Sequence, residues 1–462
     1  MKIKDNQKRF WKANNTKIVL ILIIAIFFAY STFLALRLDT GLLPDEPAHF
    51  TFSKHYSTTL GIPSDTYETY SWGWYIEQNP FLYYWINGRI INLIKFVNAG
   101  ISDLNLLIGL RLVSVLYSLG TVYFCFLFSK EVINHHWWQL LPVFLLTNTL
   151  MFVFISSGIH YDNLANFLSM LSLYFLVRSF KRKNFLGNSL VWMISIALAC
   201  LAKYTILPLA LALTVSWIVY FIMNYKGLLP LKVEIIKTII LSAVLAILLI
   251  MNFSIYGINI ICYQSLTPPC REILLESQCR ISKYEQRYND LALDTKLTLQ
   301  KTLSSDYPSP FRYIFVDWIY HILLRSFGLS GHQAYFPYHL ITCYQILYYL
   351  VIFLILLNLF FWHSFSPVEF HLLGIAAFYG LVVFIQNYNS ELVYGFRQVA
   401  VQGRYLFPVI GPIYVLIALI LKNIPIHILR WLFIVFTLSL FILGGPMTII
   451  LKYNSVFSSW LG

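Results

Sequence analysis

The chain has 462 residues, of which 58% are hydrophobic, 18% aromatic and only 11% charged. Soluble domains carry about 25% charged residues, so this composition excludes an ordinary soluble protein and indicates a multi-pass protein of a lipid bilayer. The formal net charge of +13 would also suit a nucleic-acid-binding protein. The basic residues instead lie in short segments beside apolar runs, a distribution that sets membrane topology, so we expect no nucleic-acid partner.

The first apolar run, residues 18–36, follows six basic residues and has no small-residue cleavage site after it. It predicts a retained first span with the N-terminus in the cytoplasm. Further apolar runs extend this to an all-α helix bundle of about eleven spans in a single integral-membrane domain, residues 1–462, of the inner or plasma membrane. The other expected spans are 105–128, 138–156, 163–178, 187–202, 204–223, 236–256, 340–361, 369–386, 405–421 and 428–447.

Two long loops interrupt this rhythm, residues 37–104 and 257–339, and both fall on the extracytoplasmic side. Within the first, the apolar stretch 79–97 is broken by polar residues and is predicted to be an amphipathic helix at the membrane interface. Within the second, the stretch 311–327 carries a polar stripe at every fourth position, which favours an interfacial helix over a crossing one. The second loop also contains Cys262, Cys270 and Cys279, which either form one disulfide and one free thiol or stay reduced.

The first loop opens with Pro44-Asp45-Glu46-Pro47-Ala48-His49-Phe50. A carboxylate followed by a proline in the first turn predicts the start of a helix. Asp45 and His49 then share one face, where they can form a hydrogen bond, hold a divalent metal, or act as a base and its orienting group. The alternative is that Asp45 only caps the helix and complements its dipole.

Three further sites carry ionisable residues at the outer edge of the membrane. Glu77 begins the interfacial helix and is expected near Asp45. His160 and Asp162 lie in the short turn 157–163, where they either satisfy the turn or line a cavity. Lys203 lies between two apolar spans and either extends to the interface or binds an anion.

Arg397 and the segment Gln402-Gly403-Arg404-Tyr405-Leu406-Phe407-Pro408 lie at the outer mouth of a late span. A guanidinium is planar and always charged, which suits it to phosphate, although contact with lipid headgroups is an alternative. The chain has no Gly-rich phosphate loop, no zinc spacing of Cys and His and no nucleophile elbow, so nucleotide hydrolysis and serine esterase chemistry are disfavoured.

Together the 44–50, 157–163, 201–205 and 402–408 motifs resemble the GT-C superfamily of polytopic glycosyltransferases, which use a polyprenyl-phosphate-linked sugar as donor. Within it they are most similar to a bacterial family of predicted membrane proteins of unknown function. The resemblance implies that the acidic pair lies in the active site, as in the lipid A aminoarabinose and protein mannosyltransferases, with Asp45 as base or metal-linked carboxylate and Glu46 beside it. The chain departs from those members at Asn79-Pro80-Phe81-Leu82, where they have a double proline, and in having no soluble outer domain after the last span.

We therefore expect an integral-membrane glycosyltransferase that moves a sugar from a polyprenyl-phosphate donor to an envelope glycan, lipid or protein. The expected catalytic residues are Asp45 and Glu46, and the expected substrate-binding residues are His49, Glu77, His160, Asp162, Lys203, Arg397, Arg404 and Tyr405. Lys203, Arg397 and Arg404 are expected to stabilise the leaving phosphate. A divalent metal stays open, with Asp45, Glu46 and His49 as its candidate ligands. The alternatives are a transporter or flippase of a lipid-linked or small solute, and a non-enzymatic scaffold.

Overall fold

The computed structural model describes residues 2–73, 75–228, 234–304, 307–330, 334–335, 338–362 and 365–452. Within these ranges the secondary-structure elements are all helices except for one antiparallel pair of two-residue strands, β1 (Leu329–Ser330) and β2 (Ala334–Tyr335), in which Leu329 lies opposite Tyr335. The predicted all-α fold is therefore confirmed. Parts of the predicted second loop, residues 305–306, 331–333 and 336–337, lie outside the described residues.

Eight helices in the described ranges are long and apolar enough to cross a membrane. They coincide with eight of the predicted spans, which makes the chain a multi-pass membrane protein. These helices are α1 (Lys2–Arg37, apolar from Asn15), α5 (Asp103–Val132), α9 (Phe185–Ala202), η1 with α10 (Tyr204–Ile206, Leu207–Leu228), α11 with η2 and α12 (Ile235–Asn252, Phe253–Gly257, Ile258–Tyr263), α19 with η5 (Tyr338–Leu357, Asn358–Trp362), α20 (Pro367–Tyr394), and η6 with α21 (Gly403–Val409, Ile410–Asn423).

Three predicted spans are not among these eight. Residues 138–156 form two short helices, α6 (Leu141–Thr147) and α7 (Leu150–Ser156), because the backbone leaves the helical conformation at Thr149. Residues 163–178 lie in α8 (Tyr161–Phe180), and 428–447 lie in α22 (His427–Leu443) and the start of α23 (Pro446–Lys452). The count of eleven spans and the cytoplasmic N-terminus stay predictions.

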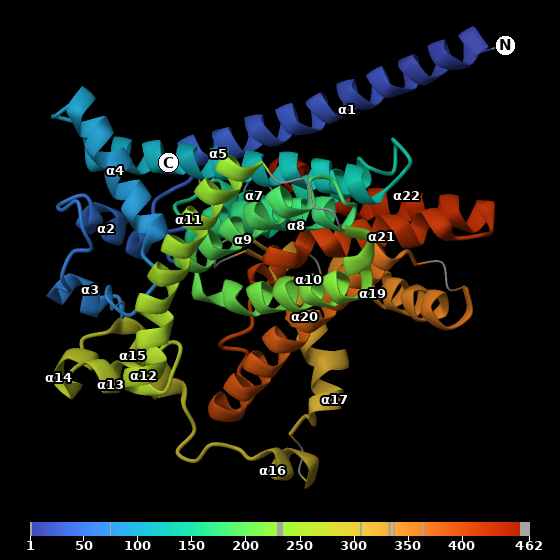
Figure 1. Cartoon of the computed structure of the whole chain (residues 1–462). Coiled ribbons are helices and arrows are strands. Elements are labelled where there is room, and N and C mark those ends of the chain that lie inside the picture. Colours follow the sequence, from blue (N-terminus) through green and yellow to red (C-terminus); the bar gives the residue numbers. More distant parts are fainter. Residues whose placement is uncertain are drawn as a thin grey trace.

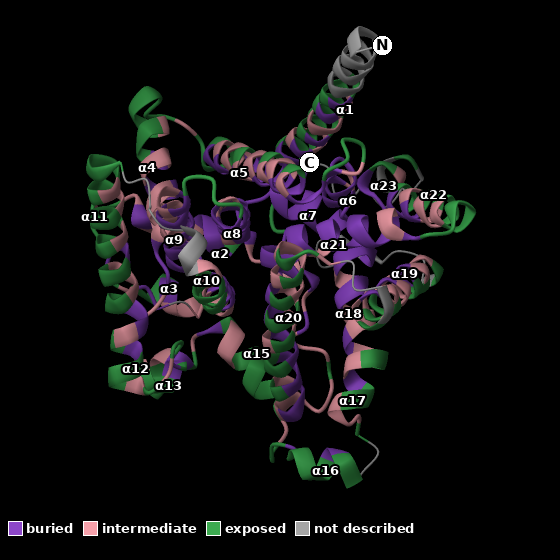
Figure 2. Ribbon diagram, turned by 45° about the vertical axis from the view of Figure 1, so that its right-hand side comes forward, coloured by how far each residue is buried: buried purple, intermediate pink, exposed green. Residues whose placement is uncertain are grey.

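The core is formed by α6 to α9 and α21, whose residues are mostly buried (Figure 2). Helix α8 packs against both α5 and α9, and α21 packs against α6 and α20. Helix α1 packs its C-terminal part on α5 while its N-terminal part extends away from the body (Figure 1). This arrangement brings the N-terminus of α8, the C-terminus of α9 and the start of η6 to one end of the core.

The first loop folds as α2 (Glu46–Tyr56), α3 (Tyr67–Ser71) and α4 (Leu82–Val97). The polar residues that interrupt the apolar stretch of α4 bind the end of α2: Arg89 donates to the carbonyls of Tyr56 and Thr59, and Asn92 donates to Ser57 O at 3.0 Å. The last carbonyls of a helix have no intrahelical partner, so these contacts satisfy them. These polar residues of α4 thus bind backbone carbonyls of the first loop, and the C-terminal end of α4 is its exposed apolar part.

The second loop forms four short helices: α13 (Cys270–Ile273), α14 (Glu276–Cys279), α15 (Lys283–Leu291) and α16 (Leu299–Ser304). Helix α14 packs against α3, whereas α16 lies apart from α3, at the bottom of Figure 1. Cys270 and Cys279 form a disulfide, whereas Cys262 is free and exposed. The disulfide packs against Tyr75 of the first loop, so the two loops form one structure.

The stretch 311–327, predicted as an interfacial helix, lies in a continuous helical run: α17 (Pro310–Arg312), η3 (Tyr313–Trp318), α18 (Ile319–Leu323) and η4 (Leu324–Gly328). Ile322, Leu323 and Phe327 are buried against the core. On the polar stripe, Arg325 donates to Gln398 O at 2.8 Å. The run is not among the eight candidate spans, and its place at the interface stays a prediction.

Candidate active site

Asp45 is held in an unusual backbone conformation at the start of α2. It occupies the N-cap position with φ 58° and ψ 7°, in the left-handed region, and its side chain makes no capping hydrogen bond. A left-handed residue other than glycine costs about 1–3 kcal/mol and persists where the surrounding structure enforces it. The interpretation of Asp45 as only a helix cap is therefore wrong, because its carboxylate binds none of the first N–H groups of α2 and is hydrogen-bonded to residues from distant parts of the chain.

Both oxygens of the Asp45 carboxylate have partners from distant parts of the chain. Arg404 Nη2 donates to Oδ2 at 3.0 Å, and the Tyr284 hydroxyl donates to Oδ1 at 2.7 Å. Burial by itself would raise the pKa of Asp45, but the Arg404 guanidinium and the Tyr284 hydroxyl contribute to holding it below its ordinary value. Asp45 is therefore ionised at neutral pH.

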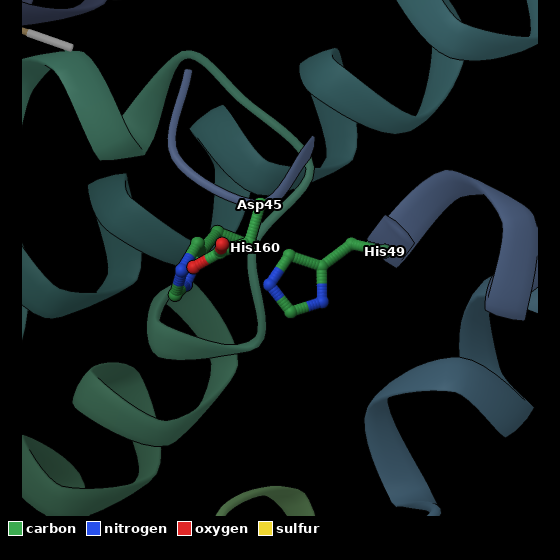
Figure 3. A group of neighbouring side chains, drawn as sticks. All are labelled: Asp45, His49 and His160. Atoms are coloured by element: carbon green, nitrogen blue, oxygen red, sulfur yellow. The ribbon is translucent and has the colours of Figure 1, made fainter. Parts of the chain in front are cut away.

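His49 and His160 lie next to Asp45, with ring centroids 4.5 Å apart (Figure 3). His49 Nδ1 is hydrogen-bonded to the Tyr84 hydroxyl at 2.8 Å, and His160 Nδ1 accepts the main-chain N–H of Asp162 at 3.1 Å. Burial lowers the pKa of His49 to about 4 and that of His160 well below its ordinary value. Both rings are thus neutral at pH 7.

Asp162 joins this group to two cations. The Lys203 ammonium binds Asp162 Oδ1, and Arg404 Nε lies 3.7 Å from Asp162 Oδ2. Lys203 is buried, with its ammonium also 4.9 Å from the Tyr161 ring centre, so the prediction that it extends to the interface is wrong. Two carboxylates and two cations balance, which is the condition for keeping ionised groups in a buried place.

Glu46 points away from this group. Its carboxylate forms a two-pronged ion pair with Arg111, Nε to Oε1 at 2.8 Å and Nη2 to Oε2 at 2.6 Å, and it accepts the main-chain N–H of Ile159 at 3.1 Å. Arg111 also donates to the carbonyl of Leu38 at 2.7 Å, at the end of α1. Both side chains are 1% exposed. Glu46 therefore links α1, α5 and the 157–160 turn beneath Asp45.

A cavity of about 980 Å³ lies over Asp45. Of the predicted site residues, Asp45, His49, Arg397, Arg404 and Tyr405 line it. His160, Asp162 and Lys203 are buried behind this surface and Glu46 deeper still. Glu77 is exposed and its neighbours Gln78 and Asn79 line the cavity in its place, so the expected proximity of Glu77 to Asp45 is not seen.

Asp45, His49 and His160 are also placed to hold a metal ion, since one ligand atom from each lies within 4.8 Å of the others. Among the described residues, His49 Nε2 and His160 Nε2 are buried without a hydrogen-bond partner, as vacant ligand atoms would be. In the tautomer that accepts the Asp162 N–H at Nδ1, the proton of His160 lies on Nε2. Metal binding through Nε2 requires the other tautomer, in which Nδ1–H gives up that contact and faces Asp162 Oδ2, 3.4 Å away. The set fits a divalent ion, with His160 in the place expected for Glu46.

Three residues that contact the predicted site residues were not predicted from the sequence: Arg111, Tyr161 and Tyr284. Arg111 lies within a predicted span, where an ionisable residue is a functional candidate by default, so that signal was available. Tyr161 lies inside the 157–163 motif, and its ring centre is 4.6 Å from that of His49. Tyr284 lies in a polar loop and carries no sequence signal.

No protein-family model matches the chain, and no curated protein matches it in sequence. Its structure is similar to the oligosaccharyltransferase of Archaeoglobus fulgidus in the apo form, with a TM-score of 0.49 and 14% identity over 93% of this chain and 55% of that one. It is also similar to AglB of Archaeoglobus fulgidus in complex with an inhibitory peptide and a dolichol-phosphate, with a TM-score of 0.47 and 16% identity over 96% and 56%.

A third similar structure is ArnT from Cupriavidus metallidurans bound to undecaprenyl phosphate, with a TM-score of 0.46 and 10% identity over 90% of this chain and 61% of that one. The chain thus spans 55% to 61% of the length of these solved structures. Similarity of this degree leaves the function to be argued from the residues of the chain itself.

Proposed function

We propose that the protein is a membrane glycosyltransferase of the GT-C type that transfers a sugar from a polyprenyl-phosphate donor to an envelope acceptor. The observation that carries the proposal is the ionised carboxylate of Asp45, held in a strained backbone conformation at the wall of a cavity of about 980 Å³. A capping side chain binds the first N–H groups of its helix, which Asp45 does not do. Its carboxylate instead lies at the cavity wall, where it is placed to accept a proton from a substrate hydroxyl.

Asp45 acts as the general base in this proposal. It takes the proton of the acceptor hydroxyl while the acceptor oxygen bonds to C1 of the sugar and the bond from C1 to the phosphate oxygen breaks. Such catalysis contributes about a hundredfold to ten-thousandfold. The His49 and His160 rings, neutral at pH 7, leave the carboxylate charge to be balanced by Arg404.

The leaving phosphate gains negative charge as the bond breaks, and positioned cations stabilise it. Arg404 and Arg397 line the cavity and are assigned this role. Lys203 binds Asp162 behind the cavity, so we assign it to fixing Asp162 and Arg404 rather than to the phosphate. A divalent ion on Asp45, His49 and His160 would supply further positive charge beside the phosphate.

The test is sugar transfer by reconstituted protein, with a labelled pool of polyprenyl-phosphate-linked sugars and an envelope extract as acceptor. Asp45→Asn is expected to lower transfer at least a hundredfold with unchanged membrane insertion. The control is Glu276→Gln, at an exposed ion pair on the second loop. Full transfer by Asp45→Asn contradicts the proposal. If the label crosses the bilayer without transfer, the protein is a transporter or flippase. If the label is neither transferred nor moved across the bilayer, the protein is a scaffold.

A further inference from the structure

Tyr284 reaches the catalytic carboxylate from the second loop. It is the second residue of α15, and its hydroxyl donates to Asp45 Oδ1 although the two residues are 239 positions apart. Burial and then the charge of Asp45 raise the pKa of Tyr284. The phenol is the donor in this contact, because an ionised carboxylate can only accept a hydrogen bond.

The N-terminal end of helix α15 packs against Trp72 and Gly73 of the first loop. Gly73 adopts φ +67°, and a Cβ there would lie 2.6 Å from Ser282 Oγ. Only glycine therefore leaves room for Ser282, the residue that precedes α15. Ser282 in turn caps the helix by accepting the N–H of Glu285 at 3.1 Å. The Lys283 ammonium lies 4.8 Å from the ring centre of Trp72. The contact between α15 and residues 72–73 is thus formed by complementary surfaces of the two loops.

The segments on both sides of α15 are anchored. Before it, the Cys270–Cys279 disulfide packs against Tyr75 of the first loop. After it, Leu293 N donates to Val393 O and Leu297 N donates to Leu392 O, both at 2.9 Å, at the end of α20. Helix α15, called the strap below, therefore lies between two anchored points, the disulfide and the end of α20, and its Tyr284 contacts Asp45.

The two carboxylate oxygens of Asp45 have different hydrogen-bond partners in this arrangement. Oδ2 faces Arg404, so Oδ1 is the oxygen available to take a proton. A hydroxyl already donates to Oδ1, which is the interaction that an acceptor hydroxyl must make before it is deprotonated. We propose that Tyr284 occupies the acceptor-hydroxyl position on Asp45 Oδ1 and acts as a shield that keeps water from this one oxygen until an acceptor displaces α15. This inference rests on the proposed function.

The shield prevents a defined side reaction. With water as acceptor, a water O–H gives its proton to Asp45 Oδ1, the water oxygen bonds to C1 of the sugar, and the C1–phosphate bond breaks to release free sugar and polyprenyl phosphate. Closing a site against water is a recognised way in which enzymes suppress such hydrolysis. The contact also lowers the apparent affinity for an acceptor, because only the open state binds it.

The experiment measures acceptor-free hydrolysis of the labelled polyprenyl-phosphate-linked sugar pool in proteoliposomes. Tyr284→Phe is expected to raise the release of free sugar roughly tenfold, the factor that corresponds to about 1.4 kcal/mol. Adding Asp45→Asn to this variant is expected to remove the increase. Tyr67→Phe is the matched control, since it removes an exposed hydroxyl from the same outer layer, outside the cavity.

Hydrogen exchange of residues 283–291 gives a readout independent of catalysis. Tyr284→Phe is expected to speed exchange there several-fold without substrate, because the helix loses its contact with the core, while Tyr67→Phe leaves it unchanged. Unchanged hydrolysis by Tyr284→Phe, in a preparation whose wild type transfers sugar, overturns this inference alone. Absence of transfer by the wild type overturns the proposed function, and unchanged exchange shows that Tyr284 does not hold the strap.

Discussion

Replacing Glu46 by glutamine keeps the shape of the side chain and removes its charge from the pair with Arg111. The pair is bidentate, at 2.8 and 2.6 Å, and both side chains are 1% exposed. Breaking a buried pair by removing one partner costs about 3–5 kcal/mol, because the remaining charge is left uncompensated. The amide oxygen of glutamine still accepts hydrogen bonds, so we expect the lower end, about 3 kcal/mol.

A loss of this size is a large fraction of the 5–15 kcal/mol by which folded domains are typically stable. The assay is the recovery of folded, detergent-purified protein after heating at a series of temperatures. Glu276→Gln is the matched control: its partner Arg280 is four residues away and both side chains are at least 65% exposed, so solvent screens the pair and no measurable loss of stability is expected.

A second measurement separates a structural role from a catalytic one. Replacing both Glu46 and Arg111 by methionine removes the two charges together and is expected to recover most of the stability lost by Glu46→Gln. If Glu46→Gln is as stable as Glu276→Gln but loses turnover, the structural reading of Glu46 is refuted, and its predicted catalytic role is restored.

Three more outcomes follow from the site. Arg404→Ala is expected to weaken donor use and to destabilise the protein more than Arg404→Lys, because it leaves Asp45 and Asp162 without their shared cation; equal donor dependence in both variants and the wild type removes Arg404 from the donor site. If Asp45, His49 and His160 hold a metal, a chelator lowers transfer, divalent ions restore it, and His160→Ala abolishes binding of the ion measured by calorimetry; a His160→Ala protein with wild-type binding excludes the site. Burial and Arg325 lower the pKa of His321 to about 4. Its unfolded form then binds more protons between pH 6.5 and 4, so stability falls as pH drops through this window. The melting temperature of His321→Gln should fall less there than that of the wild type, and parallel pH curves would exclude His321 as a source.

The position of the membrane helices was predictable from the sequence because apolarity over about twenty residues is a local property. Eight predicted spans coincide with helices of sufficient length and apolarity. Residues 138–156 show the limit of predicting spans from composition. The segment is apolar throughout, yet the chain turns at Thr149 and forms two short helices that pack in the core. Once a segment is surrounded by protein, packing decides whether it stays straight.

The residue types of the site were also predictable, because carboxylates and cations at membrane edges need partners. The partner of each charged residue could not be predicted from the sequence. Asp45 and Glu46 are adjacent in the sequence, yet Asp45 binds Arg404, 359 positions away, while Glu46 binds Arg111, 65 positions away. The left-handed turn at Asp45 sends the two side chains in different directions, and no sequence pattern specifies it.

The sequence by itself determined that this is a multi-pass helical membrane protein with an acidic motif after its first span, since both depend on local composition. Only the tertiary structure decided which acid faces the cavity, which cation balances it and that Tyr284 donates a hydrogen bond to it. Those relations join residues from both loops and several helices, and the physical reason is charge pairing in a buried site: each ionised group is stable there only beside the partner that the fold brings to it.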